Sequence, residues 1–87
     1  MNDFPRIKNN QVALVRADIN TGHILDNENK PAINGSQDIY TIFNSIDNAL
    51  DASREIIKQD EIEVIIYGSE MQVLYYLNKR SCISMSN

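Results

Sequence analysis

The segment 46–57 constrains the fold of this 87-residue chain more than any other part of it. Its apolar and small side chains recur at three- and four-residue spacing, which places them in one stripe along a helix. Ser45 stands just before the stripe, where its hydroxyl can accept a hydrogen bond from a free amide of the first turn. The pattern predicts one amphipathic helix from 46 to about Gln59, with this buried stripe: Ile46, Ala49, Leu50, Ser53, Ile56 and Ile57.

Alternating or β-prone residues predict strands in the sequence before and after this helix. They cover 11–19, 39–43, 61–67 and 73–77. A turn at 20–23 leads to the apolar pair Ile24-Leu25, which indicates a hairpin or a bent strand, and 26–37 reads as a loop. We therefore expect an α+β fold in which one helix packs on an antiparallel sheet of three or four strands, in the order β-β-β-α-β-β.

One segment permits a different fold. Apolar residues in 69–79 also fit helical spacing, with Ser69 as a possible cap, and the result would be a small α/β protein with a C-terminal helix. Val73 and the Tyr75-Tyr76 pair favour a strand instead, because β-branched and aromatic residues suit sheets. Gly68 is consistent with the turn of a short hairpin.

The length predicts a single domain, 1–87, with a flexible arm at 1–10 and a flexible polar tail at 78–87. Cys82 is the only cysteine, so it has no partner for a disulfide within the chain. We expect a cytoplasmic protein, since the N-terminus lacks the pattern of a secretory signal and no apolar run is long enough to cross a bilayer.

The charge is negative and uneven. The net charge is −4, and 38–70 holds 8 acidic residues against 2 basic ones. A direct nucleic-acid partner is not expected, because proteins that bind nucleic acids usually carry a basic excess. The acidic segment fits two interpretations: an ordinary solvated surface, or a docking face for a basic partner.

Motifs that carry chemistry are absent or incomplete. The sequence holds no glycine-rich phosphate loop and no histidine or cysteine pair at metal-binding spacing. His23 is the only histidine and lies in a predicted turn, and Asp18 begins a stretch that lacks the closing glutamate of a calcium loop. We therefore expect no catalytic residue, no cofactor and no metal, and a protein that is not an enzyme.

Two stretches of the sequence resemble a pattern found in other small proteins. The pattern of 43–45, the helix with Ala49-Leu50, and the strand 62–67 resembles small bacterial proteins of uncharacterised function that pair one helix with an antiparallel sheet. The stretch 16–22 fits the same pattern. The resemblance implies a fold and no activity.

A single helix covers only one face of a sheet, so the other face is expected to be partly open, lined by Ile65, Tyr67, Leu74 and Tyr76. The function expected is a protein-binding module, such as an inhibitor or immunity-type protein that places an acidic face against a basic partner. The alternatives are a homodimeric structural or regulatory domain and a small α/β ligand binder. The predicted partner-binding residues are Asp47, Asp51, Glu55, Glu63, Tyr67 and Tyr76.

Overall fold

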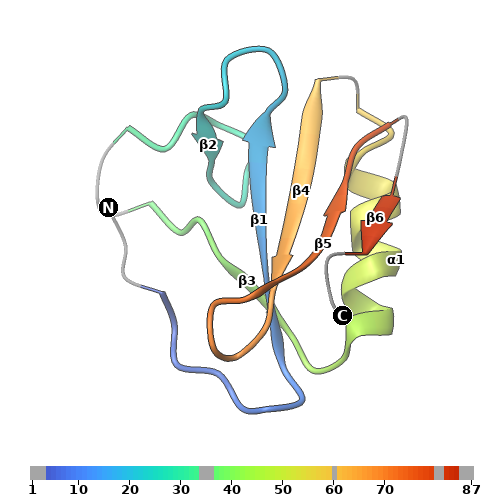
Figure 1. Cartoon of the computed structure of the whole chain (residues 1–87). Helices are drawn as coiled ribbons and strands as arrows, with labels where there is room; N and C mark the ends of the chain where they lie inside the picture. Colours follow the sequence, from blue (N-terminus) through green and yellow to red (C-terminus); the bar gives the residue numbers. More distant parts are fainter. Residues whose placement is uncertain (1–3, 34–36, 60, 80–81, 85–87) are drawn as a thin grey trace.

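The computed structural model describes residues 4–33, 37–59, 61–79 and 82–84. Its elements are β1 (Val12–Asp18), β2 (Ile24–Leu25), β3 (Thr41–Phe43), α1 (Ile46–Ile56), β4 (Ile62–Tyr67), β5 (Val73–Leu77) and β6 (Cys82–Ser84). The strands form one antiparallel sheet in the order β2-β1-β4-β5-β6, and β3 also pairs with β1 (Figure 1). The predicted α+β class with one helix is confirmed, and the element order matches up to β5.

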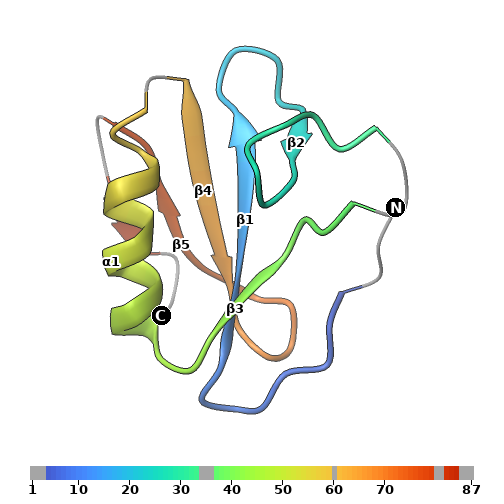
Figure 2. The same ribbon diagram turned by 180° about the vertical axis from the view of Figure 1, so that it is seen from behind.

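β1 organises the sheet because both of its edges are used. One edge pairs with β4 along 13–18, and the opposite edge is shared by β3 at Val12–Leu14 and β2 at Arg16 and Ala17. β3 and β4 therefore run parallel to each other with β1 between them, and α1 connects them as a split β-α-β unit. Figure 2 shows α1, which forms this crossover, in front of the sheet.

The core lies between α1 and the sheet. Its fully buried members are Val12, Leu14, Ala49, Val64, Ile66 and Leu77. Ala49 and Ser53 are the buried residues of α1, and the hydroxyl of Ser53 donates a hydrogen bond of 2.6 Å to the carbonyl of Ala49. This bond satisfies a polar group that would otherwise be buried without a partner. The predicted cap is also present, because Ser45 Oγ accepts a 3.1 Å hydrogen bond from the amide of Asn48.

The C-terminal part corrects two predictions. Residues 73–77 are β5, so the alternative helix at 69–79 is wrong, as cross-strand pairing with β4 fits Val73, Tyr75 and Tyr76 better than helical packing does. The predicted tail 78–87 contains β6, which pairs with β5, and the described sheet has six strands where three or four were expected. Strand β6 has only three residues, and the edge of β5 supplies their backbone partners.

A bulge changes the direction of one side chain. The register of β4 against β5 shifts between Ile66 and Tyr67, so that Ile66 pairs with Tyr75 while Tyr67 pairs with Val73. The extra residue is Leu74, which packs against the core on the helix side beside Tyr75. The expectation that Leu74 lines the face away from the helix is therefore wrong, whereas Ile65, Tyr67 and Tyr76 lie on that face.

Candidate functional site

The sheet face turned away from α1 is the first candidate, and we call it the open face (Figure 1). Strand register places on it the residues that alternate with the core positions. These residues are Ala13, Val15, Ala17, Ile42, Glu63, Ile65, Tyr67, Val73 and Tyr76. No helix covers this face in the described part of the chain, because α1 is the single helix there and lies on the other side.

The open face is apolar with one ionisable carboxyl group. Its β1 residues are small and buried, while the larger side chains of β4 and β5 around them are half-buried. Glu63 is the exception, and its carboxylate accepts a hydrogen bond from the hydroxyl of Tyr76. This bond, together with burial and the negative charge of Glu63, raises the pKa of Tyr76. The pair joins β4 to β5 across the face.

One corner of the open face is occupied by the beginning of the chain. The ring of Phe4 stands edge-on to Tyr40, with 5.4 Å between ring centroids, and edge-on to Tyr67 at 5.9 Å. Both distances fall in the range preferred by aromatic pairs. The segment 1–10 was expected to be a flexible arm, and Phe4 anchors its described part to the body of the protein.

The predicted partner-binding residues fall on two opposite surfaces. Glu63, Tyr67 and Tyr76 lie on the open face, whereas three exposed carboxylates project from α1, namely Asp47, Asp51 and Glu55. Two of these carboxylates form ion pairs: Asp51 with Arg54 of the same helix at 2.8 Å, and Glu55 with Lys58 just after the helix at 2.7 Å. The structure does not bring the six residues together, and the charge of the helical surface is partly balanced on the helix itself.

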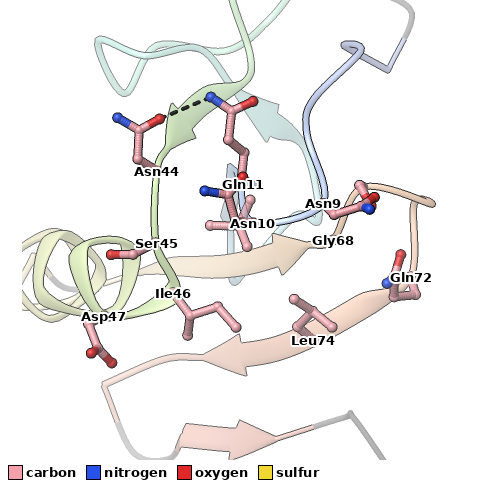
Figure 3. A pocket seen from close by; sticks show the side chains of 12 residues that line it. Asn9, Asn10, Gln11, Asn44, Ser45, Ile46, Asp47, Gly68, Gln72 and Leu74 are labelled. Atoms are coloured by element: carbon pink, nitrogen blue, oxygen red, sulfur yellow. Dashed lines mark hydrogen bonds between the residues drawn. The ribbon is translucent and has the colours of Figure 1, made fainter.

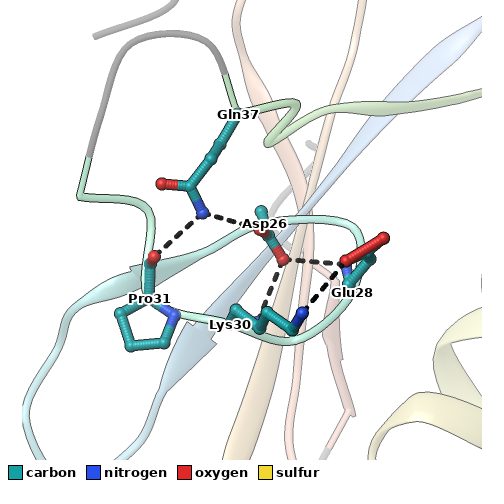
Figure 4. A network of polar contacts seen from close by, with 5 residues as sticks. All are labelled: Asp26, Glu28, Lys30, Pro31 and Gln37. Atoms are coloured by element: carbon teal, nitrogen blue, oxygen red, sulfur yellow. Dashed lines mark hydrogen bonds and ion pairs between the residues drawn. The ribbon is translucent and has the colours of Figure 1, made fainter.

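A second candidate is the loop between β2 and β3, which is built around Asp26 (Figure 4). One oxygen of the buried Asp26 carboxylate accepts hydrogen bonds from the amides of Glu28 at 2.8 Å and Lys30 at 3.0 Å. The other oxygen accepts a hydrogen bond of 2.6 Å from the side chain of Gln37. These bonds, of which the one from Lys30 contributes most, lower the pKa of Asp26. The carboxylate thus acts as the internal support of this loop.

The same loop is tied to the sheet by a second set of polar contacts. The guanidinium of Arg16 donates hydrogen bonds to Thr41 Oγ1 at 3.1 Å and to Asn27 Oδ1 at 3.3 Å. A cavity of about 260 Å³ lies beside this network and is lined by Asp26, Asn27, Glu28, Gln37 and Asp38. Because the acceptors of Asp26 already hold donors of the protein, the carboxylate is committed to the loop rather than to a ligand.

Stability is expected to fall in acid through Asp26. Its pKa in the folded chain is lower than its ordinary value of about 3.9, so folding favours the ionised form. The stabilisation is complete above about pH 5, begins to fall near the ordinary pKa of the unfolded chain, and is lost as the pH falls through the pKa of the folded state. We expect the urea midpoint of wild type to drop more steeply below pH 4 than that of Asp26→Asn, whose side chain does not titrate. Parallel pH profiles of the two proteins would contradict this role.

A third candidate is a cavity of about 310 Å³ at the start of α1 (Figure 3). Its lining is rich in carboxamides, and the Gln11 side chain donates a 3.0 Å hydrogen bond to that of Asn44. The lining residues are Asn9, Asn10, Gln11, Val12, Asn44, Ser45, Ile46, Asp47, Gly68, Ser69, Gln72 and Leu74. Asp47 is the one ionisable residue among them, so the lining offers no acid–base pair. The hydroxyl of Ser45 is already engaged as the helix cap.

His23 is exposed after the β1–β2 turn, and the side chain of Cys82 lies outside the described residues. In the described ranges, no group of three His, Cys, Asp or Glu residues is arranged to hold a metal ion. A helix long and apolar enough to span a membrane is not found there either.

Comparison of the chain with protein-family models, with curated proteins and with solved structures finds no match. The sequence predicted the loop at 26–37 and the aromatic residues of the open face, but not the hydrogen-bond network around Asp26, the carboxamide cavity or the anchor at Phe4. The signal for this turn is Asp26 at the start of a stretch rich in turn formers, because aspartate side chains often accept hydrogen bonds from backbone amides shortly after them.

Proposed function

We propose that this protein is a non-enzymatic, cytoplasmic protein-binding module that contacts its partner through the open face. The observation that carries the proposal is an apolar sheet face that no helix covers in the described part of the chain. Soluble domains rarely leave a contiguous apolar surface without a use, and such surfaces commonly bind other proteins. Tyr67 and Tyr76 suit this role, since tyrosine is enriched where a contact is apolar at one end and polar at the other.

Charge favours a basic partner. The protein has a net charge of −4, and Glu63 places a carboxylate inside the apolar face. A lysine or arginine of the partner that approached Glu63 would offset the cost of excluding water from this carboxylate. The remaining acidic residues would speed the encounter at low salt without touching the partner.

The acidic surface of α1 supports the proposal less well as the contact itself. Its carboxylates at Asp51 and Glu55 are exposed and already paired with Arg54 and Lys58. Exposed ion pairs and solvated charges of this kind contribute little binding energy. An inhibitor-type function would therefore use the open face for affinity and the helical carboxylates for long-range attraction.

The proposal is tested by one variant on each surface. Ile65→Lys places a charge in the middle of the open face, and Asp51→Asn removes a charge from α1. Affinity capture with wild type at low and high salt, followed by mass spectrometry, identifies the bound protein. We expect Ile65→Lys to reduce its recovery at least about tenfold, because a desolvated unpaired charge costs well over 1.4 kcal/mol. We expect Asp51→Asn to retain binding.

The opposite pattern, with binding retained by Ile65→Lys and lost in Asp51→Asn, would refute the open face as the contact. Sedimentation equilibrium of the same proteins at micromolar concentration detects a second copy as the partner. A wild-type dimer that Ile65→Lys converts to a monomer would identify the module as a homodimeric domain. Circular dichroism of each variant confirms that the fold is intact.

A further inference from the structure

The contact of Phe4 with the open face shows what kind of side chain this face accepts. Phe4 is half-buried, and its ring fills a slot between Tyr40, which precedes β3, and Tyr67 at the end of β4. The slot is thus formed by one residue just before β3 and one in β4, the strands on either side of β1. Its occupant comes from a segment that belongs to no strand of the sheet.

The segment around Phe4 has the chemistry expected of the partner. Residues 4–8 read Phe-Pro-Arg-Ile-Lys, with two basic residues and no acidic one, in a chain whose net charge is −4. Phe4 and Ile7 are half-buried, whereas Arg6 and Lys8 are exposed. The apolar side chains of this short segment therefore face the protein while its charges face solvent, as in a docked peptide.

The described arm is held mainly at its two ends. The Phe4 ring makes the contact at one end. The other end is a turn in which Lys8 N donates to Gln11 Oε1 at 2.8 Å and Gln11 N donates to Lys8 O at 2.9 Å. Pro5, directly after Phe4, has no amide hydrogen to donate to a neighbouring strand. An arm of this kind can detach without breaking a ladder of the sheet.

We propose that the slot between Tyr40 and Tyr67 binds an aromatic side chain of the protein partner, from an extended segment that also carries lysine or arginine, and that Phe4 occupies this slot until the partner displaces it. This inference rests on the proposed function of the open face. The arm is then an internal competitor. If it fills the slot for about nine tenths of the time, it weakens partner binding about tenfold.

The test uses the full-length protein with the slot emptied, and a synthetic peptide of residues 1–10 as the probe. Phe4→Ala and wild type, both labelled with ¹⁵N, are titrated with this peptide and followed by amide chemical shifts. We expect saturable shifts near Tyr40 and Tyr67 in Phe4→Ala, with an affinity at least about tenfold higher than in wild type. A peptide that carries the same Phe4→Ala change is the control and is expected to cause no saturable shifts. High salt is expected to weaken binding, since Arg6 and Lys8 of the peptide approach an acidic protein.

Equal binding of the peptide by wild type and Phe4→Ala, or binding by neither, would refute the placeholder role of Phe4. Phe4→Leu serves as a second host if Phe4→Ala fails to fold, because leucine keeps apolar contact and lacks the edge-on ring. Failure of this test leaves the open face itself to be judged by Ile65→Lys, whose effect on partner capture does not depend on the arm. If the peptide binds Phe4→Ala as expected but Ile65→Lys still captures the partner, the role of Phe4 stands and the proposed function of the open face is refuted.

Discussion

Replacing Ile66 with alanine is expected to lower the free energy of unfolding by about 2–5 kcal/mol. Ile66 has no exposed surface, and it lies in β4, which pairs with β1 on one side and β5 on the other. The neighbours that would have to collapse into the resulting cavity are held by two ladders of hydrogen bonds, so relaxation is restricted. A domain of this size has a total stability of about 4–13 kcal/mol, and the loss would be a large part of it.

Urea denaturation followed by far-ultraviolet circular dichroism measures this loss. Ile33→Ala removes the same atoms from a side chain that is 86% exposed and is the matched control. We expect Ile33→Ala to change stability by no more than about 0.5 kcal/mol. Similar midpoints for the two variants would show that Ile66 does not lie in the core.

Enlarging Ala49 to leucine is expected to destabilise the protein by about 1–3 kcal/mol. Ala49 is fully buried where α1 meets the sheet, and it belongs to the same core cluster as Val64 and Leu77. A small residue lets the helix approach the strands closely. Three additional carbon atoms would have to push the helix outward or force neighbouring side chains from their preferred rotamers.

Ala52→Leu is the control for this effect. Ala52 is also in α1 but only half-buried, so the larger side chain has room to turn toward solvent. Both substitutions have a similar effect on helix propensity, because the residues exchanged are the same. Equal destabilisation of the two variants would contradict close packing at Ala49, and the comparison is made by urea denaturation of both proteins.

Local patterns predicted the parts of the fold that depend on local periodicity. The helix followed from the spacing of apolar residues in 46–57, and β4 followed from the alternation of Ile62, Val64 and Ile66 with their neighbours. Ser45 was predictable as the cap because the capping interaction spans only three residues. Each of these features depends on residues close together in the chain.

Features that depend on distant residues could not be predicted in this way. The orientation of Leu74 follows from a bulge opposite β4, and β6 has only three residues and forms by pairing with the edge of β5. The anchor at Phe4 requires Tyr40 and Tyr67, which only the folded sheet brings together. The open face was predicted in outline, because a single helix covers only one face of a sheet. That the open face and the acidic surface of α1 lie on opposite sides of the protein could be seen only from the register of the strands.

The pairing of β1 with β4 has a consequence for how the chain becomes folded during its synthesis. β1 leaves the ribosome before β2, β3 and α1, and its principal partner β4 follows all of them. During this interval the buried residues of β1 have only the short β2 and β3 as partners, which leaves one edge of an apolar strand free. We therefore expect the native structure to form late, once β4 has emerged, because the sheet depends on pairing between segments that are distant in the sequence.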